Sequence, residues 1–127
     1  MTNKEKETLV LARLAAQTMD EKKAEDVHII DLRKVYGAPA EYFVIASGNV
    51  PSHVSALSDA VYETIKKATQ QAPHKIEGYQ NAEWILMDYF DVIVHIFQKD
   101  KREFFRLDQL WNDGEEVAIS NSNNTKQ

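Results

Sequence analysis

Apolar residues recur at helical spacing in two segments of the chain. The first stripe, within residues 4–20, consists of Val10, Leu11, Leu14, Ala15 and Thr18. The second stripe is more regular and consists of Val54, Leu57, Val61, Ile65 and Ala68. Spacings of three and four residues predict amphipathic helices in both places. Pro51 suits the first turn of the second helix, Pro73 ends it, and Asn49 or Ser52 is expected to cap it.

Runs of β-branched and aromatic residues predict the strands. They cover residues 27–32, 42–46, 84–88 and 92–97, with a short polar strand at 75–79 at or near an edge. The run at 42–46 is apolar throughout, as in strands that are covered on both faces. A tight hairpin is expected at residues 89–91. Phe90 should resist a positive φ, so we expect another turn type there or a local packing role for its ring.

The last part of the chain divides into a helix and a polar end. A helix is expected to open at Asp100, with Glu103 at capping-box spacing and apolar anchors between residues 104 and 111. From Gly114 onward the chain is rich in polar residues and resembles a frayed tail. The pattern predicts one α/β domain at residues 1–113, with a mixed sheet of about five strands flanked by helices. Residues 114–127 are expected to form a disordered tail that can be removed without loss of folding or binding.

Composition narrows the possible partners. The 127 residues suit one domain, and 15 basic against 20 acidic residues give a net charge of −5. The lysines are scattered among acids, whereas nucleic-acid binders usually carry a basic stripe, so direct nucleic-acid recognition is disfavoured as the main contact. An acidic chain suits a basic protein partner. No signal peptide or long apolar run is present, so we expect a cytoplasmic protein without a membrane contact.

Residues suited to catalysis do not form a recognised motif. There is no cysteine, and the four histidines are scattered. His95 lies in the middle of a strand with Ile93 and Phe97 on its face, which fits a hydrogen-bonded structural residue better than a ligand or base. Ser47-Gly48-Asn49 could hold an anion at a helix N-terminus, but the same residues suit any strand-to-helix turn. Neither a cofactor nor a metal site is expected.

Trp84 opens a strand whose two faces differ. If Ile85 and Met87 face the core, alternation places Trp84, Leu86 and Asp88 on the other face. Trp84 then belongs either to a second covered face or to a protein interface rimmed by acidic residues. Both interpretations remain open from the strand pattern alone.

Several ordered motifs resemble the ribosomal silencing factor family, also called Iojap. They begin with Leu32, residues 42–49 (YFVIASGN) and His53-Val54, and continue with Glu77-Gly78-Tyr79, residues 84–88 (WILMD) and residues 91–97 (DVIVHIF). Arg102, Phe105, Leu107, Leu110 and Trp111 complete the set. The match runs from about residue 6 to 113. One departure is Tyr89-Phe90, where many members carry a small residue before the aspartate.

The resemblance implies a small α/β domain similar to the nucleotidyltransferase core, without that superfamily's metal-binding carboxylates. It also implies a homodimeric, non-enzymatic bacterial translation repressor. Such a protein binds universal large-subunit protein fourteen on the large ribosomal subunit, blocks joining of the small subunit, and lowers translation when nutrients are short. By resemblance, the contact residues are Trp84, Leu86 and Asp88, with Glu77 and Tyr79 as neighbours.

Two alternatives to a repressor are compatible with a small α/β domain. One is a metal-dependent, nucleotidyltransferase-like enzyme that uses Asp88, Asp91 and His95. Such an enzyme would need a pair of carboxylates separated by one residue on a strand and a basic residue on the turn after residue 46. The present sequence has neither. The other is an assembly factor for the large subunit, which would share the same partner and differ in timing.

Overall fold

The computed structural model describes residues 2–102 and 112–120 and contains one mixed sheet. Its helices are α1 (Asn3–Glu21) and α2 (Pro51–Thr69), with one 3-10 turn, η1 (Lys99–Lys101). Its strands are β1 (Glu25–Asp31), β2 (Tyr42–Gly48), β3 (Lys75–Glu77), β4 (Trp84–Asp88), β5 (Val92–Gln98) and β6 (Glu115–Val117). They lie in the order β3-β4-β5-β2-β1-β6. Only the central β2–β5 pair is parallel, so the expected mixed α/β sheet is confirmed, with six described strands.

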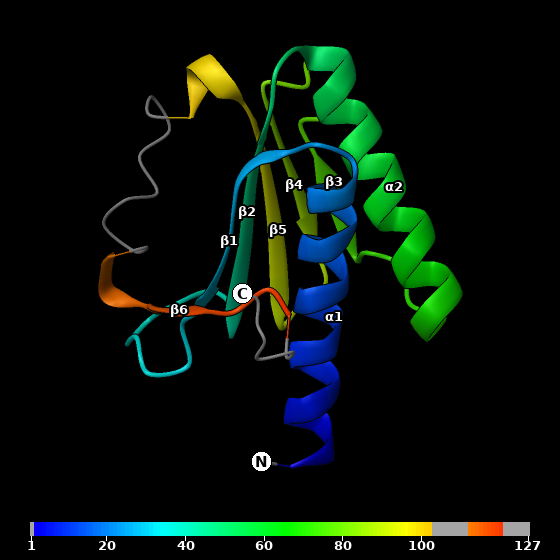
Figure 1. Ribbon diagram of the computed structural model, residues 1–127. Coiled ribbons are helices and arrows are strands. Elements are labelled where there is room, and N and C mark those ends of the chain that lie inside the picture. The colour runs from blue at the N-terminus through cyan, green and yellow to red at the C-terminus, as the bar shows by residue number, and fades with distance from the viewer. Residues whose placement is uncertain (1, 103–111, 121–127) are drawn as a thin grey trace.

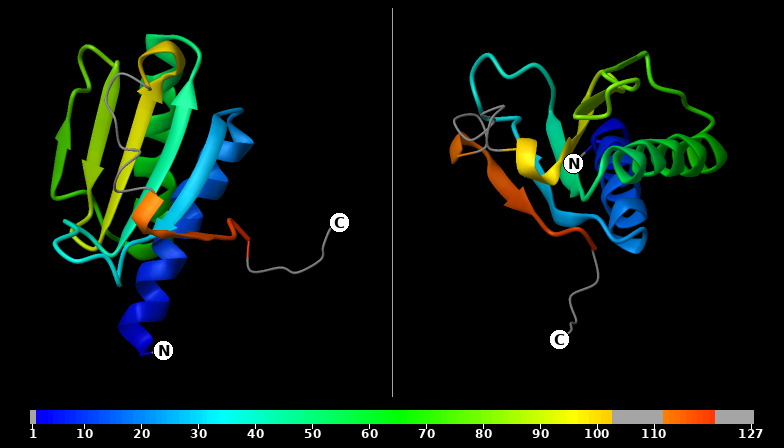
Figure 2. Two further views of the ribbon diagram at one scale, coloured as in Figure 1. Left: turned by 90° about the vertical axis from the view of Figure 1, so that its left-hand side faces the viewer. Right: turned by 90° about the horizontal axis from the view of Figure 1, so that it is seen from above.

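Both long helices pack on the same face of the sheet, which we call the helix face (Figure 1). The left view of Figure 2 shows the strands side by side, with the helices behind them. Alternation along β2 divides its side chains: Val44 joins the helix-face core, whereas Phe43 and Ile45 point to the second face. Both sets are buried, as the apolar run in this strand predicted.

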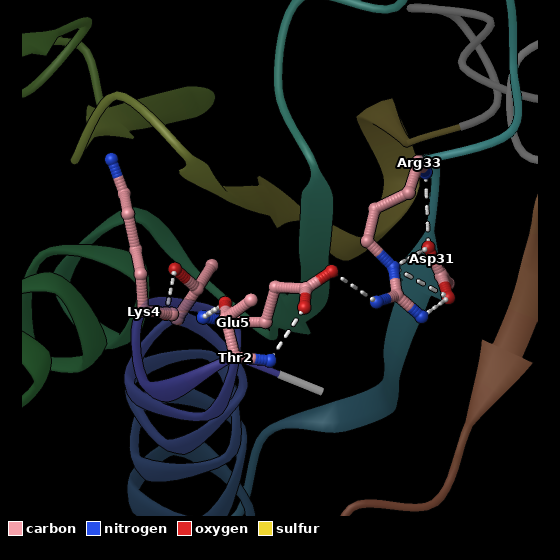
Figure 3. Close-up of polar contacts among 6 residues, drawn as sticks. Thr2, Lys4, Glu5, Asp31 and Arg33 are labelled. Atoms are coloured by element: carbon pink, nitrogen blue, oxygen red, sulfur yellow. Dashed lines mark hydrogen bonds and ion pairs between the residues drawn. The ribbon is translucent and has the colours of Figure 1, made fainter.

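The N-terminus of α1 is tied to the end of β1 by a polar network (Figure 3). Thr2 and Glu5 form a reciprocal capping box, which satisfies two backbone N–H groups. The Glu5 carboxylate also lies 3.6 Å from the Arg33 guanidinium, which forms a bidentate pair with Asp31. The Arg33 hydrogen bond holds the pKa of Asp31 below its ordinary value.

The start of α2 differs from the expected cap. Val50 is the N-cap residue and makes no side-chain cap hydrogen bond, so the expectation that Asn49 or Ser52 caps this helix is wrong. His53 instead accepts the Asn49 backbone N–H at Nδ1, while its Nε2 lies 2.9 Å from the Lys22 carbonyl oxygen. One imidazole thus connects the start of α2 with the end of α1.

The C-terminal segment corrects the prediction of a disordered tail. Residues Glu115–Val117 form β6, an antiparallel edge strand beside β1. Beyond it, the carbonyl oxygens of Ala118 and Ile119 accept hydrogen bonds from Arg13 and Gln17 of α1. The expectation is therefore wrong for residues 115–120, because short polar segments can pair when a neighbouring strand offers an edge. The expected helix beyond Lys101 and the end of the tail fall on residues 103–111 and 121–127, outside the described residues.

The β4–β5 hairpin adopts the conformation that the sequence made least expected. Phe90 has φ 70°, and its backbone N–H donates to the Asp88 carboxylate at 2.8 Å. The expectation that Phe90 would avoid a positive φ is therefore wrong.

In the described part of the chain, no helix has the length and hydrophobicity needed to cross a membrane.

Candidate protein-binding site

Strand β4 separates its side chains between the two faces as alternation predicted. Ile85 and Met87 are fully buried in the helix-face core, while Trp84 and Leu86 are only half-buried on the second face. Asp88 shares the second face and is also half-buried. The strand therefore places two large apolar side chains and a carboxylate where a partner can reach them. We call Trp84, Leu86, Asp88 and their β3 neighbour Glu77 the Trp84 patch.

Strand register fixes what surrounds this patch. On β3, Glu77 lies opposite Leu86, and Lys75 lies opposite Asp88. On β5, His95 lies opposite Leu86 and Phe97 lies opposite Trp84. Directly opposed residues share a face, so both histidine and phenylalanine lie beside the indole. The structure thus brings together four of the five expected contact residues.

Tyr79 is the expected residue that the structure separates from the others. Gly78, at φ 79°, turns the chain after β3, and the Tyr79 hydroxyl donates to Asp59 of α2 at 2.9 Å. Tyr79 therefore contacts the helix layer, on the opposite side of the sheet from Trp84. It is 42% exposed, but at this edge rather than within the patch.

Gly78 also limits how β4 can begin. A Cβ atom on this residue would lie 2.1 Å from the Trp84 carbonyl oxygen. Together with the positive φ, this contact favours glycine and fixes the distance between the turn and the first residue of the patch.

The rim of the patch carries both signs of charge. Lys75 lies 2.9 Å from Glu77, and Lys101 lies 4.0 Å from Glu83, which precedes Trp84. All four side chains are substantially exposed, so these pairs contribute little to stability. Asp88 differs from these four residues, because its carboxylate is half-buried and lies on the same strand as Trp84 and Leu86.

His95 forms the floor of the patch. It is 3% exposed, and its Nδ1 accepts a hydrogen bond from the Trp84 indole Nε1–H at 3.0 Å. The indole stacks on Phe97 with 5.2 Å between ring centroids, and the imidazole lies edge-on to Phe43 at 4.4 Å. Burial lowers the pKa of His95 to about 3, so its imidazole is neutral near pH 7. The sequence interpretation of His95 as a hydrogen-bonded structural residue fits these contacts.

Comparison with known proteins places the chain in a family. The family model described as "Ribosomal silencing factor during starvation" matches residues 4–127. The ribosomal silencing factor of Halalkalibacterium halodurans is 36% identical over 111 residues, covering 86% of this chain and 92% of that protein. The chain belongs to the ribosomal silencing factor family.

Two further comparisons show what this member of the silencing factor family shares with known proteins. A crystal structure of a Bacillus halodurans protein is similar with a TM-score of 0.74 and 31% identity, covering 87% of this chain and 98% of that one. A mouse protein named "Mitochondrial assembly of ribosomal large subunit protein 1" is 30% identical over 73 residues, covering 56% of this chain and 32% of that protein. The family resemblance and the α/β fold read from the sequence are both confirmed, and the family name indicates ribosome-associated regulation of translation.

The residues considered for an enzyme do not form a metal site in this family member. Among residues 2–102 and 112–120, no group of three or more histidine, cysteine or acidic residues could hold a metal ion. His95 faces Trp84, while Asp91 lies in the turn between β4 and β5 and pairs with Lys4 at 3.6 Å. Residues 47–49 also have one backbone donor fewer for an anion, because the Asn49 N–H already donates to His53 Nδ1.

Proposed function

We propose that this protein represses translation by binding universal large-subunit protein fourteen through the Trp84 patch and blocking joining of the small subunit. Family membership supports a ribosomal role. The observation that carries the choice of surface is the contrast along β4: Ile85 and Met87 are fully buried, whereas Trp84 and Leu86 keep exposed area on the second face.

The chemistry of the patch suits a basic protein partner. Large aromatic side chains surrounded by polar groups are the usual centre of a protein interface, and they account for much of the binding energy. Asp88 and the net charge of −5 favour encounter with a positively charged surface. Steric blocking requires only a stable contact and the volume of the domain, so this proposal needs no catalytic group.

Sedimentation with purified ribosomal subunits tests the proposal. We expect the protein to migrate with the large subunit and to reduce the yield of joined ribosomes when small subunits are added. Trp84→Ala and Leu86→Ala should each weaken binding about tenfold or more, as expected for central interface residues. Binding to isolated universal large-subunit protein fourteen, measured by calorimetry, should show the same losses.

Tyr62→Ala is the matched control, because Tyr62 is 38% exposed on α2, on the other side of the sheet. It should bind as the unaltered protein does, and unfolding curves should show that all variants are folded. Association with neither subunit would refute the repressor proposal. Unchanged binding by a folded Trp84→Ala variant would refute the choice of surface.

Three finer features belong to the same proposal. The protein acts in the bacterial cytoplasm, forms a homodimer, and lowers translation when nutrients are short. The bacterial relatives and the starvation named in the family description support the first and third features. The sequence resemblance supports the second, and sedimentation of the protein alone tests it.

A role in assembly of the large subunit is the second candidate function. It is favoured by the name of the mouse relative, which refers to mitochondrial assembly of that subunit. The two roles differ in the state of the particle that is bound. Association with immature large-subunit particles and not with mature subunits would favour assembly, whereas binding to mature subunits favours repression.

A further inference from the structure

The indole of Trp84 is held by two neighbours on β5. Its Nε1–H donates to His95 Nδ1 at 3.0 Å, and its ring stacks on Phe97 with an interplanar angle of 22°. The register explains this geometry, because Phe97 is directly opposite Trp84 and His95 lies one diagonal step away. The stacking limits the tilt of the ring, and the hydrogen bond selects which edge of the indole points toward the imidazole.

The hydrogen bond requires one form of the imidazole. A neutral histidine that accepts at Nδ1 carries its proton on Nε2, and a protonated ring could not accept at all. Burial among Phe43, Phe97 and Ile45 keeps the ring neutral. The same burial leaves Nε2 without a hydrogen-bond partner in the part of the chain that the structure describes.

An unpaired buried N–H group lowers stability, so this histidine is not the residue that packing alone would favour. A leucine would fill an apolar site between Phe43 and Phe97 without an unsatisfied polar atom. What the histidine adds is an acceptor for the indole. Its position is therefore explained by an effect on Trp84 rather than by its contribution to the core.

We infer that His95 is a positioning residue for the Trp84 patch, holding the indole in one orientation before the partner binds. An oriented side chain loses less conformational entropy on binding, which strengthens association without adding a contact. The inference rests on the proposed function of the patch, and it assigns a role to a residue that touches no partner.

Two substitutions of His95 distinguish its effect on the orientation of the Trp84 indole from its effect on core packing. His95→Leu keeps the volume and removes the acceptor, whereas His95→Asn keeps an oxygen close to the place of Nδ1. His95→Leu should weaken binding to purified large subunits by about three- to tenfold, the value of one lost hydrogen bond. His95→Asn should bind within about twofold of the unaltered protein.

Trp84→Phe provides a second route if His95→Leu does not fold. It keeps an aromatic ring to stack on Phe97 and removes the donor, so its loss of binding should resemble that of His95→Leu. The double variant should bind no more weakly than the worse single variant, since both remove the same hydrogen bond. Additive losses would contradict the inference.

A spectroscopic readout is independent of the ribosome. The indole N–H resonance of Trp84, identified by its absence in Trp84→Phe, should shift in His95→Leu and return toward its original position in His95→Asn. Unchanged binding and an unchanged resonance in His95→Leu would overturn the inference. If Trp84→Ala still loses binding in that case, the proposed function stands without the positioning role. If Trp84→Ala binds normally, both the positioning role and the choice of surface fail.

Discussion

Phe90 is the single residue whose backbone conformation conflicts most with its type. Its φ of 70° falls in the left-handed region, which costs a residue with a Cβ about 1–2 kcal/mol. The side chain is 65% exposed, and its ring lies 4.4 Å from that of His74. The hydrogen bond to Asp88 and the two flanking strands hold the turn in place, so the chain tolerates this strain.

Substitution at Phe90 can separate backbone strain from the lost ring contact. Phe90→Gly and Phe90→Ala both remove the ring, and only alanine retains a Cβ at the positive φ. We expect the glycine variant to be more stable than the alanine variant by about 1 kcal/mol, the reverse of their order in a helix. Urea unfolding of the pair measures this difference. An alanine variant as stable as the glycine variant would show that the turn relaxes to another conformation.

Strand β6 is the element that the sequence pattern could not predict. Three residues, two of them glutamates, contain too little alternation to indicate a strand. Its position depends on the free edge of β1, which lies more than eighty residues earlier in the chain. Gly114, where the expected tail began, passes so close to β1 that a Cβ there would lie 2.4 Å from Ile30. The glycine therefore marks a close approach between segments rather than the end of the domain.

Removal of β6 should destabilise the protein. A chain that ends at Gly114 loses the pairing with β1, the partial burial of Val117 and Ile119, and the hydrogen bonds from Arg13 and Gln17. We expect its free energy of unfolding to fall by about 2 kcal/mol. A chain that ends at Ser120 keeps these contacts and is the control. Equal unfolding midpoints for the two chains would mean that β6 adds nothing to stability.

The parts of the site that follow local rules were predictable. The alternation of apolar residues along β4 correctly placed Trp84 and Leu86 on one face and Met87 on the other. The strand predicted at 75–79 ends at Glu77, since the positive φ at Gly78 turns the chain two residues early and separates Tyr79 from the patch. The contact between His95 and Trp84 required the β4–β5 register, which the unexpected turn at Phe90 determines.

Across the whole molecule, the two faces of the sheet differ in how much of the buried core they contain. The helix face contains most of the buried core, with α1 and α2 covering β1, β2, β4 and β5. The second face has a smaller buried cluster beside the half-buried Trp84 and Leu86. Because the helix layer supplies most of the apolar burial, substitutions at the edge of the second face can alter binding while the domain stays folded. This separation makes the Trp84 patch accessible to mutational tests.

The stability of the whole domain should depend on pH through His95. Its pKa is about 3 when folded, against an ordinary value of 6.5, because burial penalises the charged ring. Between these values the unfolded chain binds a proton that the folded protein does not. Stability is therefore fully present above pH 6.5 and falls by about 1.4 kcal/mol per pH unit as the pH is lowered through this window.

The measurement is the free energy of urea unfolding between pH 7.5 and 5, where Asp31 is not yet protonated in either state. His95→Asn is the matched variant, because it removes this titration and leaves the other three histidines in place. The unaltered protein should lose more stability than the variant over this range, by an amount that grows steadily below pH 6.5. Parallel curves would mean that the imidazole accepts a proton in the folded state. In that case His95 could not remain a hydrogen-bond acceptor for Trp84, and the orientation of the indole would itself depend on pH.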